Sequence, residues 1–535
     1  MQADSRKIIS ENIVADRSKL KIICVFLHRI YFGRIPYERQ YRGKKRKAMN
    51  ITELQQSYAS HPNVEGVCRL LKDNSVRHLY CGGLYASAAS LFSSVLVQRA
   101  TCPLVFILGD MEEAGYFYHD LTQILGTEQV LFFPSSFRRA IKYGQKDAAN
   151  EILRTEVLSR LQKGEEGLCV VTYPDALAEK VVSRKELGDN TLKLHAGERV
   201  DMNFVTDVLR SYGFEYVDYV YEPGQYAVRG SIIDVFSFSS EYPFRIDFFG
   251  DEVESVRTFE VETQLSKEKK ESIVIVPDLS HSLEKKGSGG MVSFLDFLPS
   301  DSLLAMRDFL WLRERIQTVH DESLTPQAIA ARESEENGAI TLEGKLIDGG
   351  EFTLRALDFR RMEFGNKPTG TPDATVSFHT TVQPIFHKNF DMVAESFREY
   401  LSRHYTIYIC SDSLKQTDRI RAIFEDRGDN ISFTAVERTL HEGFADDTLR
   451  ICVFTDHQLF DRFHKYNLKS DKARSGKVAL SLKELNQFTP GDYVVHTDHG
   501  VGRFAGLVRI PNGDTTQEVM KIVYQNEDVV FVSIH

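Results

Sequence analysis

The segment from Gly83 to Ser90 has the spacing of a phosphate-binding loop. Such loops read G-x-x-x-x-G-K-[ST], and their backbone amides and lysine hold the phosphates of a nucleotide. Here Ala88 and Ala89 stand where the second glycine and the lysine are required. Alanine cannot supply the charge that lysine places on the phosphates. We therefore predict that this loop is a structural turn between a strand and a helix, with nucleotide binding as the alternative.

A second set of residues indicates protein docking. In "FRIDFFG" the alternation of a strand sends one set of side chains to the core: Phe244, Ile246 and Phe248. The opposite set is Arg245, Asp247 and Phe249, and in "YAVRGSIIDVF" Arg229 also points away from the core. An exposed phenylalanine beside a cation and an anion is typical of a protein-binding surface. From the pattern alone, a solvated strand face remains the alternative.

Two further motifs lie near the end of the chain. "HTDHGVG" places His496 and His499 in H-x-x-H spacing around Asp498, and no third ligand follows nearby. We predict a glycine turn there and no metal site. In "EVMKIVYQ", Met520 and Ile522 share one side of a strand, for which core packing is the expectation and an exposed edge strand that recruits a partner is the alternative.

The elements that position these residues follow three patterns. From Met49 to about residue 190, continuous apolar strands alternate with amphipathic helices, which indicates a RecA-like or Rossmann-like parallel sheet. Antiparallel strands and then a charged, loop-rich stretch follow. A second α/β pattern occupies roughly 380–465, and glycine-rich turns join short strands in 488–535.

Composition narrows the class of protein. The 535 residues include 66 basic and 76 acidic ones, a formal net charge of −10, which argues against general adhesion to nucleic-acid backbones. The seven cysteines are odd in number and form no C-x-x-C, so neither a disulfide framework nor a zinc site is expected. No apolar run reaches the roughly 18 residues that a membrane crossing needs. We expect a cytoplasmic protein with no membrane contact.

The two ends of the chain differ from its middle. Residues 1–48 include the basic run "YRGKKRKA", and we expect a disordered extension there, with a nucleic-acid-binding or lipid-binding arm as the alternative. The last β pattern stops at His535 before it is complete, so we expect a truncated domain.

Two long motifs resemble known families. "EPGQYAVRGSIIDVF" with "PFRIDFFGDEVESVRTFEVETQ" is similar to a signature of the excision-repair protein UvrB and the bacterial transcription-repair coupling factors. "PGDYVVHTDHGVGRFAGL" with "EVMKIVYQNEDVVFV" resembles the RNA-polymerase-interacting domain of the coupling factors, which is related to CarD-type regulators. UvrB has an intact phosphate-binding loop and a tyrosine-rich hairpin, where this chain has only Phe137 and Tyr143. The order and separation of the two motifs match those of the coupling factors. The resemblance covers nearly all of residues 49–535.

The resemblance implies an α/β fold built from several domains. It implies a degenerate RecA-like domain with an inserted antiparallel β domain, a small α/β domain and a partial small β-barrel of the Tudor or CarD-like type. The ranges that we assign are 49–188 for UvrB-like domain 1a, 189–278 for the UvrA-binding β domain, 279–378 for UvrB-like domain 1b, 379–465 for the small α/β domain, 466–487 for a linker and 488–535 for the polymerase-interacting domain.

The resemblance also implies partners. In the family, the β domain binds UvrA through two arginines sixteen residues apart and a phenylalanine four residues further on, which match Arg229, Arg245 and Phe249. Asp247 is the expected fourth member. The last domain of the family binds the β subunit of RNA polymerase, and Met520 with Ile522 matches the contact strand. We expect Arg245→Glu to abolish UvrA binding and to leave the fold intact.

The family's motor is an ATP-dependent DNA translocase, and its motifs do not occur in this segment. We expect no catalytic residue, metal or cofactor here, because ATP and Mg²⁺ belong to the motor, and most DNA contact belongs there too. The expected role is that of a monomeric adaptor that recruits UvrA to stalled RNA polymerase. The alternatives are a nucleotide-binding, helicase-like ATPase and a CarD-like transcription regulator.

Overall fold

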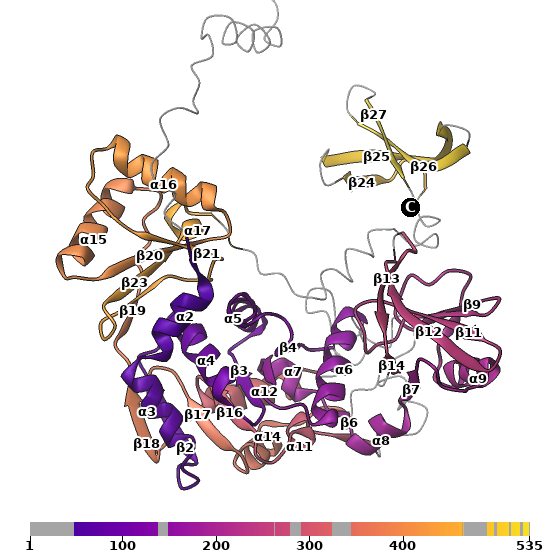
Figure 1. The fold of residues 1–535 in the computed structure, drawn as a ribbon, viewed down its shortest axis with the longest axis horizontal. Helices are drawn as coiled ribbons and strands as arrows, with labels where there is room; N and C mark the ends of the chain where they lie inside the picture. The colour runs from indigo at the N-terminus through magenta and orange to yellow at the C-terminus, as the bar shows by residue number, and fades with distance from the viewer. Residues whose placement is uncertain are drawn as a thin grey trace, which may run out of the picture. The chain divides into compact units, whose positions relative to one another are not determined.

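The computed structural model describes residues 48–136, 148–261, 263–278, 290–323, 344–462, 464, 489–496, 500–512, 515–524 and 528–533. The chain divides into two compact units, Met1–Ala48 and Met49–His535. Apart from Ala48, the predicted extension lies outside the described residues, and so does the predicted linker over 466–487. The labelled helices and strands of Figure 1 belong to the second unit.

A seven-stranded parallel sheet is the centre of the first α/β domain (Figure 1). In spatial order its strands are β18 (Ala374–Ser377), β2 (His78–Gly82), β17 (Arg360–Glu363), β16 (Leu303–Met306), β3 (Leu104–Ile107), β5 (Cys169–Thr172) and β4 (Val130–Phe133). All side chains of β2, β3, β4, β5 and β16 are buried, because helices cover both faces of the sheet. The predicted parallel sheet is confirmed.

Crossover helices cover the two faces of this sheet. Crossovers that advance toward β4 carry α4 (Ala88–Arg99) and α5 (Met111–Leu125). Crossovers that return toward β18 carry α6 (Ala148–Lys163), α12 (Phe309–Ser323) and α14 (Gly349–Ala356). Because such crossovers are right-handed, the two groups lie on opposite faces. The shorter helices of this part are α2 (Ile51–Ala59), α3 (Pro62–Leu70), α7 (Pro174–Ala178), α8 (Arg184–Asp189) and α11 (Phe294–Phe297).

The ranges 49–188 and 279–378, which the sequence separates, share one sheet and one hydrophobic core. Strands β16, β17 and β18 of the later range lie between or beside strands of the earlier one. A two-stranded pair, β6 (Val181–Val182) and β15 (Met291–Val292), also joins the two ranges. The β domain is therefore an insertion into a single α/β domain.

The inserted β domain is a six-stranded sheet with α9 (Met202–Ser211) packed on it. In spatial order its strands are β13 (Ser266–Lys270), β12 (Glu252–Phe259), β11 (Phe244–Phe249), β10 (Ile232–Val235), β9 (Gln225–Arg229) and β8 (Glu215–Tyr216). Strands β9 to β13 pair with one another in antiparallel fashion, as predicted, whereas β8 pairs with β9 in parallel. A separate antiparallel pair, β7 (Leu192–His195) and β14 (Ser272–Ile275), contributes Leu194, Ile273 and Ile275 to the same core.

The small α/β domain is also confirmed, with one addition from outside its predicted range. Its six strands, in spatial order, are β1 (Met49–Asn50), β21 (Thr434–Glu437), β20 (Thr406–Ser411), β23 (Ile451–Thr455), β22 (Phe444–Asp446) and β19 (Thr380–Val382). Its helices are α15 (Phe390–Ser402), α16 (Leu414–Asp426) and α17 (Asp456–Leu459). The first strand of the described chain thus pairs in parallel with β21, far along the sequence.

The terminal domain is a four-stranded antiparallel sheet in the order β24 (Tyr493–His496), β25 (Gly500–Asn512), β26 (Thr515–Val523) and β27 (Val529–Ser533). Among the described strands, β24 and β27 are its edges, so the predicted partial barrel is seen as an open sheet. None of the described helices combines the length and apolar composition that a membrane crossing needs. The six described cysteines are free thiols.

Candidate functional site

The loop with the spacing of a phosphate-binding loop, Gly83 to Ser90, connects β2 to α4. Gly83 has a positive φ of 76°, and Ala88, Ala89 and Ser90 are buried in the first turn of α4 with exposures of 0%, 2% and 2%. The helix begins after Ser87, whose side chain does not cap it. Its hydroxyl group instead bonds to a carboxylate from the neighbouring helix.

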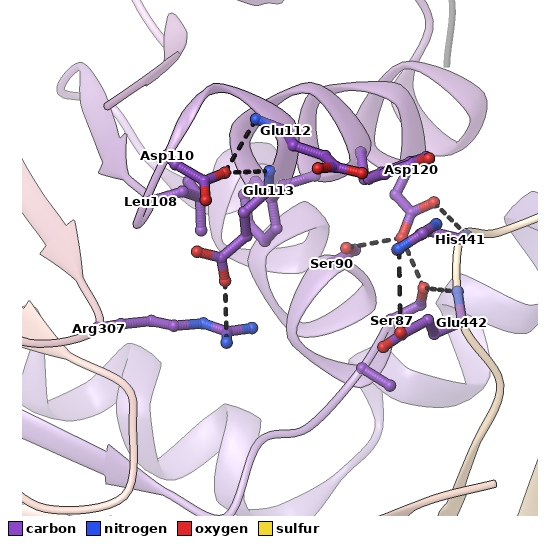
Figure 2. A pocket seen from close by; sticks show the side chains of 13 residues that line it. Ser87, Ser90, Leu108, Asp110, Glu112, Glu113, Asp120, Arg307, His441 and Glu442 are labelled. Carbon is purple, nitrogen blue, oxygen red and sulfur yellow. Dashed lines mark hydrogen bonds and ion pairs between the residues drawn. The ribbon is translucent and has the colours of Figure 1, made fainter. Parts of the chain in front are cut away.

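That carboxylate belongs to Asp120 of α5 and lies beside the start of α4 (Figure 2). Its Oδ2 accepts hydrogen bonds from the hydroxyls of Ser87 at 2.6 Å and Ser90 at 2.9 Å. Its Oδ1 accepts the amide of His441 at 2.7 Å, and the amide of Glu442 donates to Ser87 Oγ at 3.0 Å. The loop therefore binds an internal carboxylate and a backbone segment of the small α/β domain.

The cavity beside this loop is acidic. It encloses about 350 Å³, and the carboxylates that line it are Asp110, Glu112, Glu113, Asp120 and Glu442. Among the described lining residues the cations are Arg307, whose Nη1 lies 2.9 Å from Glu113 Oε1, and the titratable His441. A surplus of negative charge repels phosphate, which supports the prediction that this loop does not hold a nucleotide.

Two titratable groups at this cavity are perturbed by burial. Burial raises the pKa of Asp120 to about 7, although hydrogen bonds from Ser87, His441 and Ser90 favour its charged form. Burial lowers the pKa of His441 to about 4. Asp110 lies between β3 and α5, where a metal-binding acid would be sought. It accepts the amides of Glu112 and Glu113 at 2.9 Å each and caps α5.

The proposed docking face of the β domain is held together by a buried carboxylate. Asp234 of β10 lies opposite Arg245 of β11 in the register, and its side chain is 1% exposed. Arg245 Nε donates to Asp234 Oδ1 at 2.7 Å, and Arg245 Nη2 donates to Oδ2 at 2.8 Å. Arg229 Nη2 also donates to Asp234 Oδ2. The hydrogen bond to Asp234 raises the pKa of Arg245, so Arg245 stays charged.

The structure brings the four predicted residues to one sheet face but exposes them unequally. Phe249 is 79% exposed, whereas the side chains of Arg229, Arg245 and Asp247 are 34%, 14% and 14% exposed. Asp247 accepts the hydroxyl of Ser255 at 2.7 Å and also binds Arg257. The predicted core set, Phe244, Ile246 and Phe248, is buried as expected.

Asp234 is the member of this face that sequence reasoning missed. It follows Ile233 in "SIIDVF", and the alternation that turns Ile233 into the core turns Asp234 to the arginine face. This signal was present in the sequence. Its significance depends on the pairing of β10 with both β9 and β11, which the sequence does not state.

In the terminal sheet, the two residues that match the polymerase-contact strand are buried. Met520 and Ile522 are 6% and 3% exposed and pack with Phe504 in the core of this sheet. Strand β26 lies between β25 and β27, so it is not an edge strand. These two residues therefore pack in the core, which was the default expectation from the sequence. The other face exposes a set of apolar side chains, Tyr493, Val495, Val501, Val529 and Phe531.

The histidine motif and the UvrB-hairpin region are described only in part. His496 ends β24, whereas Asp498, His499, Phe137 and Tyr143 lie outside the described residues. Among the described residues, no three histidine, cysteine or acidic side chains form a group that could hold a metal ion.

Comparisons with known proteins match both of these domains to families. Residues 192–281 match the family described as the UvrB interaction domain, and residues 488–535 match the CarD-like/TRCF RID domain. A transcription-repair-coupling factor of Staphylococcus aureus (strain bovine RF122 / ET3-1) is 23% identical over 516 residues. The chain resembles the transcription-repair-coupling factors. The resemblance expected from the motifs is thereby confirmed.

A second transcription-repair-coupling factor, from Bacillus subtilis (strain 168), is 22% identical over 530 residues. Both matches cover 84% of this chain and 44% of the relative. This chain thus spans less than half the length of the transcription-repair-coupling factors that it matches.

Proposed function

We propose that this segment is an adaptor that recruits UvrA to stalled RNA polymerase through protein–protein docking. The observation that carries the proposal is the face of the β domain, where Phe249 is 79% exposed on the same sheet face as Arg229, within the match to the UvrB interaction domain. A large exposed aromatic side chain next to an arginine is the composition of an interface hot spot. The arginine supplies charge-assisted hydrogen bonds to an acidic group of UvrA.

We also propose that the terminal sheet binds the β subunit of RNA polymerase. Met520 and Ile522 would support the sheet from its core, and the exposed apolar face that contains Tyr493, Val495 and Phe531 would contact the polymerase. The match of 488–535 to the CarD-like/TRCF RID domain supports this assignment. The chain would act in the bacterial cytoplasm, where DNA and both partners are found.

We propose no catalytic role for this segment, because the degenerate loop lacks the phosphate-binding lysine and its Ser87 and Ser90 hydroxyls donate to Asp120. ATP hydrolysis and translocation along DNA would belong to the part of the coupling factors that this chain does not span.

Calorimetric titration of UvrA into the full chain tests the proposed UvrA site. We expect Phe249→Ala to weaken binding about thirtyfold and Arg229→Ala about tenfold, since hot-spot truncations cost about 2 kcal/mol or more. Leu354→Ala is the matched control for Phe249, because Leu354 is 71% exposed on α14. Arg427→Ala is the control for Arg229, because its side chain is 32% exposed and pairs with Asp391 and Asp429. If the two site variants and the two control variants all bind UvrA with the same affinity, the proposed site is refuted.

A further inference from the structure

The two arginines of the docking face, Arg229 and Arg245, both bind one buried group, the carboxylate of Asp234. Asp234 uses both carboxylate oxygens on Arg245 and one of them also on Arg229, and no part of its side chain beyond 1% reaches solvent. A carboxylate that is buried between two guanidinium groups fixes the position of both, because moving either one leaves a buried charge less well compensated. The arginines are thus one assembly and not two separate contacts.

Arg245 uses its guanidinium nitrogens for hydrogen bonds within the domain. Its Nη1 donates to the carbonyl of Gln264 at 3.1 Å, and its guanidinium carbon lies 4.5 Å from the centre of the Phe259 ring. Three of its nitrogens are therefore engaged within the domain, and its side chain is 14% exposed. Little of Arg245 is left for a partner.

Arg229 is held between two groups and remains accessible. Asp234 binds its Nη2 on one side, and its guanidinium carbon lies 4.9 Å from the centre of the Tyr219 ring. Its side chain is 34% exposed, and Tyr219 is 51% exposed. Arginine loses side-chain entropy when it is fixed, so an arginine that is already fixed binds a partner at lower cost.

The charge of the face indicates what the accessible arginine would bind. Within the ion-pair cluster of this face, three arginines, Arg229, Arg245 and Arg257, are opposed by two carboxylates, Asp234 and Asp247. One positive charge is left over. The strand register also places Glu252 and Lys269 on this face, outside the cluster. Asp247 and Arg257 pair with each other, and Arg245 is the more buried partner of Asp234, so the surplus charge is accessible at Arg229.

We propose that Asp234 and Tyr219 are positioning residues, which hold the guanidinium of Arg229 ready for a single carboxylate of UvrA beside the Phe249 anchor. This inference rests on the proposed UvrA site. Arg245 completes the assembly from within and makes at most a minor contact with the partner.

Tyr219→Ala in the full chain tests this proposal without risk to the core. Removing the ring frees Arg229, and we expect UvrA affinity to fall about fivefold, as for the loss of a cation–π contact of about 1 kcal/mol. The matched control is Tyr221→Ala, because Tyr221 is equally exposed at 51% and its ring is not the one that Arg229 contacts. The control should bind within twofold of the wild type.

A double-mutant cycle separates positioning from independent contact. If Tyr219 acts through Arg229, the variant Tyr219→Ala/Arg229→Ala binds no more weakly than Arg229→Ala alone. Losses that multiply would show that Tyr219 contacts UvrA by itself and would overturn its positioning role. An unchanged affinity of Tyr219→Ala would overturn it as well.

A second double-mutant cycle combines Asp234→Asn with Arg229→Ala and again measures the affinity for UvrA. Hydrogen exchange of the β10 and β11 amides shows whether the sheet of the Asp234→Asn variant is intact. The expected result is again a non-additive loss, and additive losses would overturn the role of Asp234. If Asp234→Asn does not fold, the Tyr219 cycle still decides whether Arg229 is positioned. Failure of the wild-type chain to bind UvrA would instead reject the proposed function, and the inference with it.

Discussion

Arg229 and Arg245 share a buried carboxylate, yet substitutions at the two residues should have different effects. Arg245→Glu would set a second carboxylate against Asp234, and breaking a buried pair costs about 3–5 kcal/mol. Arg229→Ala leaves Asp234 bound to Arg245 through two hydrogen bonds. We therefore predict that Arg245→Glu accelerates hydrogen exchange of the β10 and β11 amides, whereas Arg229→Ala does not. Equal protection in both variants would show that Arg245 is a contact and not a support.

This prediction replaces the expectation from sequence that Arg245→Glu leaves the fold intact. Alternation along β11 correctly places Arg245 on the face opposite the core set, but it does not show how deeply the Arg245 side chain is buried. The burial of Arg245 comes from Asp234 on β10, from Phe259 at the end of β12 and from Gln264 beyond it, so it depends on strand pairing that one strand's pattern cannot show.

Asp120 should make stability depend on pH. The pKa of Asp120 is raised by burial from its ordinary value of 3.8 to about 7 in the folded chain. A raised pKa means that the folded chain holds a proton that the unfolded chain has lost. The contribution of Asp120 to stability is thus complete below about 3.8 and is lost as the pH rises through about 7. The loss amounts to about 4 kcal/mol at most.

Melting temperatures of the wild type and Asp120→Asn between pH 5 and pH 8 measure this contribution. We predict that the advantage of the wild type over Asp120→Asn is largest at pH 5 and falls up to about pH 7. Ser90→Ala keeps the carboxylate and should keep this pH dependence. A difference between wild type and Asp120→Asn that stays constant with pH would contradict the account.

At the scale of elements, the turn before α4 explains why the first glycine of the degenerate loop is retained. A Cβ atom at Gly83 would lie 2.1 Å from the carbonyl oxygen of Phe378, and its φ is 76°. At Gly126, which ends α5, φ is 83° and no atom would lie within 4 Å of a Cβ. Gly83 is therefore required for packing against the segment after β18, and not only for its backbone conformation.

Denaturant unfolding of two alanine variants tests this role. Gly126→Ala should cost about 1–2 kcal/mol, the strain of a left-handed residue. Gly83→Ala should cost at least about 2 kcal/mol more, because its Cβ meets backbone that must move. Equal costs for the two variants would mean that the contact with Phe378 does not constrain the turn.

Elements with strong apolar patterns could be predicted from the sequence, and one without such a pattern could not. Strands β3 and β4 are buried on both faces and read as continuous apolar runs. Strand β13 has the sequence SKEKK, and all five residues are exposed. It is the edge strand of its sheet, where lysines discourage pairing with other chains, so its composition resembles that of a loop.

At the scale of the whole molecule, the sequence identified the parts but not how they are joined. The sheet of the first α/β domain is completed only by β16, β17 and β18, which follow the inserted β domain. The small α/β domain is tied to the earlier chain by β1 and by Tyr58, whose hydroxyl donates to Asp446 at 2.9 Å. Strand order and such long-range contacts have no signal in local periodicity.

The central claim is that this chain joins UvrA to RNA polymerase, and a bridging assay tests it most directly. UvrA is passed over immobilised RNA polymerase with and without the chain, and the retained UvrA is measured. We predict that UvrA is retained only when the chain is present, that Phe249→Ala reduces retention at least tenfold, and that Leu354→Ala does not. Retention of UvrA that is independent of the chain, or unchanged by Phe249→Ala, would contradict the account.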